Sequence, residues 1–165
     1  MLAQPARKAA LVAHVVTSVG WLGAVGVFLV LAIAGLLSTD AVAVHSLYLA
    51  MALSGWYVIV PLCLASFASG VVMSFGTAWG LFRHYWVLLK LAMIIPSTLL
   101  LLMHLRPIDQ ILGTTTSALV DLRLLKIQLV VETVAALAVL LVATILSVYK
   151  PRGVTRFAAR RLPLP

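Results

Sequence analysis

Long apolar stretches dominate the chain, and short polar segments separate them. The stretches cover about residues 11–37, 47–75, 85–105 and 127–149. Each is at least as long as the roughly 20 residues that an α-helix needs to cross a hydrocarbon core of about 30 Å. No stretch alternates between apolar and polar residues as a half-buried strand would. The pattern predicts an all-α integral membrane protein: one bundle of four transmembrane helices in residues 1–149, followed by a tail over residues 150–165.

The composition agrees with lipid as the main solvent of the chain. Hydrophobic residues make up 64% of the sequence and charged residues only 10%, which is outside the range of soluble globular proteins. Arg7 and Lys8 precede the first apolar stretch, as they would in a signal peptide. That stretch exceeds the roughly 7–15 apolar residues of a signal peptide, so we expect it to be retained as the first helix. The single cysteine, Cys63, excludes an internal disulfide bond.

Charged residues are divided unequally between the two sides that four crossings create. The side with both termini has nine basic residues and no acidic residue: Arg7, Lys8, Arg83, Lys90, Lys150, Arg152, Arg156, Arg160 and Arg161. The other side has three basic and four acidic residues: Arg106, Arg123, Lys126, Asp40, Asp109, Asp121 and Glu132. Because basic residues concentrate on the cytoplasmic side, the asymmetry predicts that both termini are cytoplasmic. We expect the protein in the cytoplasmic (inner) membrane of a bacterium.

The basic tail points to a partner. A formal net charge of +8 could indicate nucleic-acid binding in a soluble protein. Here the tail over residues 150–165 adjoins an anionic inner leaflet, where each basic residue can gain about 1 kcal/mol. We therefore expect membrane lipids, and not nucleic acid, as its partner. A membrane protein or a second copy of the chain is a further candidate partner for the helices.

Small residues and turn signals divide the apolar stretches. Gly20, Gly23 and Gly26 would let a neighbouring helix backbone approach the first helix. They follow no predicted strand, so a dinucleotide-binding loop is not expected. Asp40 offers an N-cap for the second helix, and Pro61 should free a carbonyl group and kink it.

Ionisable residues in the apolar stretches are the candidates for chemistry, because a charge in hydrocarbon is costly. His14, His84 and Lys90 fall on the side of the termini. Imidazole is an axial ligand of haem b, and Lys90 could pair with a haem propionate, an anionic lipid or a substrate. Alternatively, the histidines are polar residues near the headgroups, and Lys90 extends its side chain to the same interface.

A second set of candidates falls on the opposite side. His45 and His104 form a candidate metal site there, with Met51 or Met103 as a soft ligand for copper. The alternative is again a polar role near the headgroups. Glu132, in the fourth stretch, either pairs with Lys126 or Arg123 or is a buried carboxylate that carries a proton or binds a cation.

Two segments resemble known families. Residues 79–106 contain Gly80 in an aromatic turn and Leu89-Lys90-Leu91, and they resemble the CopD copper-resistance membrane domain, with His104 where that family has Asn. The segment from His14 to the Gly20-Trp21-Leu22-Gly23 run resembles the opening shared by CopD and the haem-binding HemJ family.

The two resemblances imply different chemistry. CopD implies a four-helix unit that takes part in metal traffic. HemJ implies haem b near the first-helix histidine and a redox role, and only His14 and Lys90 match its positions.

Three functions follow from these observations. The working hypothesis is a non-catalytic membrane subunit or accessory protein that packs against partner helices. The first alternative is a haem b-binding redox protein that exchanges electrons with quinone, and the second is CopD-like copper or cation transfer. We do not expect an enzyme.

Overall fold

The computed structural model describes residues 3–76, 85–113 and 122–149. The predicted aromatic turn with Arg83 and His84, the loop after Gly113 and the basic tail from Lys150 lie outside these residues. The described part contains only helices and turns and no strand, which confirms the all-α prediction.

Six helical segments follow one another along the chain. They are α1 (Gln4–Leu37), α2 (Ala41–Ser54), the π-helical segment η1 (Gly55–Ile59), α3 (Val60–Gly76), α4 (Tyr85–Leu112) and α5 (Arg123–Tyr149). Several helices extend beyond the apolar stretches that predicted them. α1 starts at Gln4 with a proline in its first turn, where the missing N–H group is not needed. α4 continues past residue 105 to Leu112.

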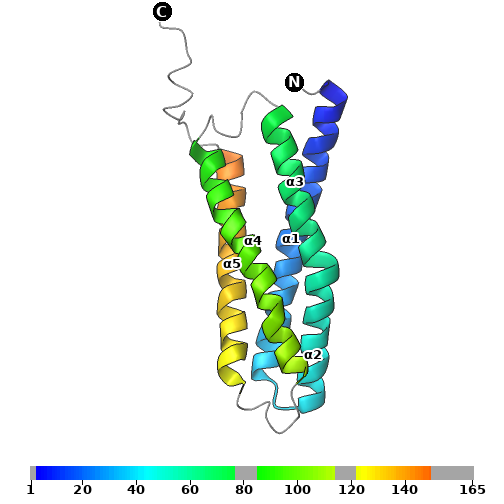
Figure 1. Cartoon of the computed structure of the whole chain (residues 1–165), viewed down its shortest axis with the longest axis vertical. Helices are drawn as coiled ribbons and strands as arrows, with labels where there is room; N and C mark the ends of the chain where they lie inside the picture. The colour runs from blue at the N-terminus through cyan, green and yellow to red at the C-terminus, as the bar shows by residue number, and fades with distance from the viewer. Residues whose placement is uncertain (1–2, 77–84, 114–121, 150–165) are drawn as a thin grey trace, which may run out of the picture.

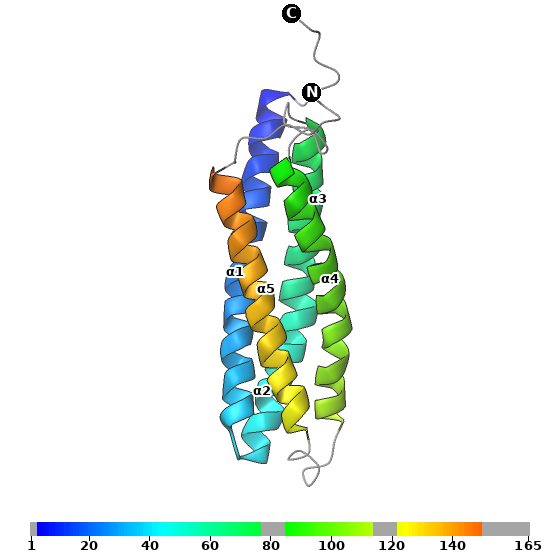
Figure 2. The ribbon, with the colours of Figure 1, turned by 90° about the vertical axis from the view of Figure 1, so that its left-hand side faces the viewer.

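The helices form an up-and-down bundle (Figures 1 and 2). α1 packs against α2, α3 and α5, while α4 packs against α2 and α5. α2, η1 and α3 form one continuous rod (Figure 1). The start of α1, the end of α3, the start of α4 and the end of α5 lie together, and we call this the terminal end. We call the opposite end the loop end.

Three helical spans are long and apolar enough to cross a membrane. They are Gln4–Leu37, Ala41–Phe75 and Arg123–Tyr149, and α4 contains a shorter apolar segment, Val87–Met103. Large hydrophobic side chains are exposed on all of these helices. Such a surface suits lipid and would be unusual for a soluble protein. The structure therefore supports a membrane protein.

At the loop end, a short polar turn joins α1 to α2. The carboxylate of Asp40 accepts hydrogen bonds from the backbone N–H groups of Val42 and Ala43, at 3.3 and 3.1 Å. Asp40 thereby satisfies two of the N–H groups that a helix leaves without a partner at its start. The predicted N-cap is confirmed.

The middle of the second rod contains a π-turn that the sequence did not reveal. The N–H of Val60 donates to the carbonyl of Gly55, five residues earlier. Pro61 follows directly, and its ring has no N–H to donate and would crowd the carbonyl four residues earlier in a regular helix. A widened turn is one way to accommodate such a residue.

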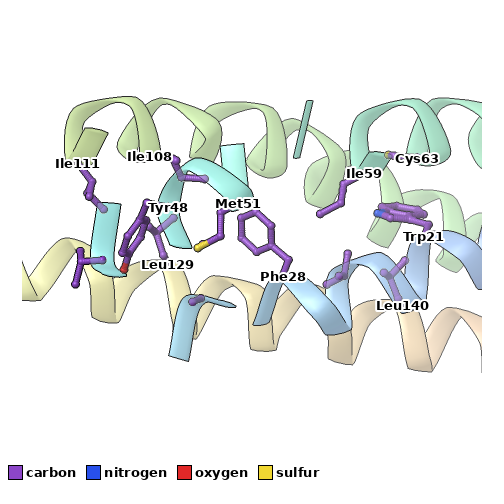
Figure 3. Close-up of a cluster of buried hydrophobic side chains, with 13 residues drawn as sticks. Trp21, Phe28, Tyr48, Met51, Ile59, Cys63, Ile108, Ile111, Leu129 and Leu140 are labelled. Atoms are coloured by element: carbon purple, nitrogen blue, oxygen red, sulfur yellow. The ribbon is translucent and has the colours of Figure 1, made fainter. Parts of the chain in front are cut away.

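The main apolar core fills the loop-end half of the bundle and continues towards its centre. Tyr48 and Met51 from α2 lie beside Phe28 from α1 in the interior (Figure 3). Ile108 from α4 and Leu129 from α5 close the same cluster. This core joins all four rods of the bundle.

Close packing between α1 and α2 depends on Gly35. A Cβ atom at Gly35 would lie 2.7 Å from Cε2 of Tyr48, whose side chain is fully buried. The glycines that the sequence singled out behave differently. Gly20 faces Leu62, but nothing described outside their own helix lies within 4 Å of a Cβ at Gly23 or Gly26. No helix of the described chain approaches Gly23 or Gly26 closely, so the predicted approach of a neighbouring helix to these two glycines stays a prediction.

We expect Gly35→Ala to destabilise the fold by about 1–3 kcal/mol, because overpacking a filled site forces neighbouring groups to move. Titration of the detergent-solubilised protein with SDS, followed by circular dichroism, measures the change. Gly23→Ala is the matched control, since its methyl group meets open space. We expect that control to change the free energy of unfolding by less than about 1 kcal/mol. Equal losses in both variants would contradict the role of Gly35.

Candidate functional site

The interior of the terminal end contains polar side chains from all four rods, starting with His14 on α1. Its Nδ1 atom lies 3.0 Å from the carbonyl oxygen of Ser66 and 3.1 Å from Oγ of Ser69, both on α3. A carbonyl oxygen can only accept a hydrogen bond, so Nδ1 carries the hydrogen. Nε2 is therefore the ring atom that remains available to bind a proton or a ligand.

The position of the His14 ring depends on a glycine. A Cβ atom at Gly70 would lie 3.1 Å from Cε1 of His14. Such a contact is tighter than ordinary van der Waals packing, so a side chain at this position would push the ring away from α3. Gly70 thus allows the imidazole to lie against the helix and reach the backbone of Ser66.

A second polar contact between α1 and α3 lies one turn deeper in the bundle. The hydroxyl groups of Ser18 and Ser66 are 2.7 Å apart. Ser66 is 6% exposed, so both its carbonyl and its hydroxyl serve the contact with α1. In an apolar medium such contacts help to fix which face of each helix turns inward.

Lys90 makes the corresponding contact between α4 and α5. Its Nζ atom donates to Oγ of Ser147 at 2.8 Å, and Ser147 donates to the carbonyl of Ala143. His14 on α1 and Lys90 on α4, two of the three residues of the predicted inner set, both belong to the terminal half of the bundle (Figure 1). The third, His84, lies outside the described residues.

A small, mostly apolar cavity lies near the centre of the bundle. Trp21, Ile94, Ser97 and Leu140 are among its lining residues, and its volume is about 20 Å³. The indole Nε1 of Trp21 is buried and has no hydrogen-bond partner in the described part of the chain. The cavity has room for about one water molecule, and the Ser97 hydroxyl offers it a second polar partner. A haem macrocycle does not fit this space.

Sequence reasoning missed most of this arrangement. His14, Ser18 and Trp21 follow the spacing of one helix face, which is the signal that was available. Ser66 and Ser147 gave no signal of their own, because serines on membrane helices commonly bond their own backbone. Ser69 and Ser147 do so here, yet they also meet His14 and Lys90.

The structure describes the side chains of only some of the predicted copper ligands at the loop end. His45 is exposed, whereas Met51 lies in the apolar core on another face of α2. Met103 is 66% exposed, and the side chain of His104 lies outside the described residues. The described residues include no group of three or more His, Cys, Asp or Glu side chains that could hold a metal ion. The metal site predicted at His45 and His104 therefore stays a prediction.

The loop end contains another buried cation. Lys126, expected outside the apolar part of its helix, is only 7% exposed, and its Nζ lies 5.9 Å from the centre of the Tyr48 ring. This is a favourable cation–π distance. Glu132 accepts a hydrogen bond from Gln128 at 2.8 Å. The proposed roles of Glu132 as an ion-pair partner or proton carrier stay predictions.

Comparison with protein-family models, curated proteins and solved structures finds no match for this chain. The resemblance to the CopD and HemJ families therefore stays a prediction.

We expect Gly70→Ala to displace the His14 ring and lengthen its contact with Ser66, because the added methyl group would lie 3.1 Å from Cε1. NMR of the protein with labelled histidines measures the shifts of the ring, and His14→Gln identifies the His14 signals. Gly26→Ala adds a methyl group at a position with no described atom within 4 Å and should leave these signals unchanged. Identical His14 signals in the wild type and Gly70→Ala would contradict the described contact.

Proposed function

We propose that the chain is a non-catalytic membrane subunit that packs against a partner helix through the outer face of α1. It crosses a bacterial cytoplasmic membrane four times and has both termini in the cytoplasm. The observation that carries the proposal is a face of glycine and valine residues on α1 that has no covering partner within the described chain.

This outer face follows a helical spacing. Val19, Val27 and Val30 are 60–66% exposed, and Gly23 and Gly26 lie between them. Glycine within a helix costs about 0.5–1 kcal/mol relative to alanine. Packing within the described chain does not offset that free-energy cost, because no described atom lies within 4 Å of a Cβ atom at Gly23 or Gly26. A second helix in close contact would offset it, because small residues at membrane interfaces allow extensive van der Waals contact between helix backbones.

The number of crossings and the orientation rest on packing and charge. α4 runs between the same two ends of the bundle as α5, which it contacts, so its apolar segment Val87–Met103 shares the depth of α5. The nine basic residues that the sequence assigns to the terminal end support a cytoplasmic location of this end.

A haem b-binding redox protein is the second candidate, and the hydrogen bond of His14 favours it. With Nδ1–H held by the carbonyl of Ser66, Nε2 has the lone pair that a metal needs. Lys90 could pair with a propionate. The macrocycle would require space between α3 and α4 beyond the cavity described above. No observation gives similar support to copper transfer, so we do not propose it.

Cross-linking tests the outer face of α1. In a Cys63→Ser background, we expect Val27→Cys to form a disulfide-linked or bifunctionally cross-linked product in native membranes, whose mass identifies a second copy or another protein. Adding Gly23→Ile should reduce the product several-fold, because a branched side chain prevents close approach. Val134→Cys on α5 is the matched control: it is also well exposed and about as far from the loop end. Equal product at Val27 and Val134 would contradict the proposal.

An optical spectrum tests the haem alternative. A protein purified from haem-replete cells should show a Soret band that shifts on reduction and is lost in His14→Ala, while His45→Ala keeps it. A protein without the band after reconstitution with haem would contradict this alternative.

A further inference from the structure

The indole of Trp21 is a buried hydrogen-bond donor at the middle of α1. Its side chain is only 4% exposed, and its Nε1–H group has no acceptor in the described part of the chain. Trp21 lies about midway between Gln4 and Leu37, so the group lies near the middle of the hydrocarbon that α1 spans. A polar group without a partner is costly there, because bulk water does not reach it.

The indole N–H faces the small cavity at the centre of the bundle. Trp21 is followed one turn nearer to the loop end by Val25, and both residues line the cavity. On α4, Ser97 is followed in the same way by Leu101, and both of these line it too. The cavity therefore extends from the indole towards the loop end. In Figure 3 the nitrogen atom of Trp21 lies at the edge of the ring that points in this direction, towards Phe28.

Ser97 supplies an acceptor at the same cavity. Its hydroxyl donates to the carbonyl of Met93 at 2.8 Å, so the lone pairs of Oγ remain available to a further donor. No direct hydrogen bond joins Trp21 to Ser97, although both line the cavity. A ligand between them has to accept from the indole and donate to the hydroxyl oxygen. Water does both.

The size of the cavity selects the ligand. Its volume of about 20 Å³ has room for about one water molecule. The remaining lining is apolar, with Ile94 on α4 and Ala136, Val139 and Leu140 on α5. A wholly apolar cavity of this kind would stay dry. Here a donor and an acceptor meet in it, and they supply the two hydrogen bonds that a buried water molecule needs as a minimum.

We propose that a single buried water molecule links α1 to α4 at this cavity, accepting a hydrogen bond from Nε1 of Trp21 and donating one to Oγ of Ser97. α1 and α4 lie diagonally across the bundle, since each packs against α2 and α5 and they make few contacts with one another. The water molecule thus supplies a polar link across the bundle at a depth that bulk water does not reach. The site is in the interior and is separate from the outward glycine–valine face of α1.

Water-selective NMR of the full chain in nanodiscs tests the proposal. With isotope-labelled tryptophan, the Trp21 indole signal is the one that Trp21→Phe removes. Magnetisation transfer in the rotating frame separates a bound water molecule from hydrogen exchange, because the two give cross-peaks of opposite sign. We expect a dipolar cross-peak between water and Nε1–H of Trp21, and none for Trp56, which is 49% exposed and faces lipid. A missing cross-peak at Trp21, or an equal one at Trp56, would overturn the proposal.

Ser97→Ala removes the acceptor. This variant should weaken the Trp21 cross-peak several-fold and shift the indole signal, because the water molecule loses one of its two hydrogen bonds. Ser54→Ala is the matched control, since Ser54 also donates to a carbonyl of its own helix and is not among the residues that line the cavity. Equal weakening in the two variants would overturn the proposal.

Filling the cavity distinguishes a bound water molecule from an empty space. Ala136→Val adds methyl groups to the lining and should displace the water molecule, so the cross-peak is lost and the Trp21 signal shifts. Ala138→Val adds the same groups at an exposed position of the same helix and should change neither. Should Ala136→Val fail to fold, as judged by circular dichroism, Ser97→Ala remains the test. Greater resistance of Ala136→Val to SDS with an unchanged Trp21 signal would overturn the proposal in favour of an empty cavity.

Discussion

Hydrocarbon offers no hydrogen bonds, and this constraint governs how the backbone and most hydroxyl side chains described in this bundle are bonded. The backbone meets it by forming helices, whose N–H and C=O groups bond within one segment. Side chains meet it in two ways. Serines and threonines bond the carbonyls of their own helix, as Thr133 does with Leu129, and a few of them also reach a neighbouring helix. Those few contacts help to fix the rotation of each helix in the terminal half.

Different interactions hold the helices together in the two halves of the bundle. In the loop-end half, the shape of large side chains determines the fit, and Gly35 provides the space that the Tyr48 ring occupies. In the terminal half, hydrogen bonds of His14, Ser18 and Lys90 connect the helices in pairs. An apolar core is rigid and excludes water.

The sequence predicted the parts of the fold that depend on local chemistry. Apolar stretches predicted where the helices are, because each must be long enough to cross hydrocarbon, and Asp40 marked the start of α2. The position of each residue within its apolar stretch also predicted that His14 and Lys90 lie at a similar depth in the membrane. The hydrogen-bond partners of His14 could not be predicted, because Ser66 and Ser69 are more than 50 residues away in the sequence. The direction in which their polar groups point depends on the rotation of α3 about its own axis. The burial of Lys126 was missed for the same reason, because it depends on the ring of Tyr48 from α2.

The π-turn of η1 has a consequence for that rotation. Successive residues of an α-helix differ by about 100° around the axis, so one additional residue accommodated in a single turn changes the angular phase of everything after it. Met51 on α2 and Cys63 on α3 are both buried, and their separation of 12 residues would place them about 120° apart around a regular helix, but only about 20° apart once one residue is accommodated in the wider turn. The length of the segment between Ser54 and Val60 therefore decides which side chains of α3 meet His14.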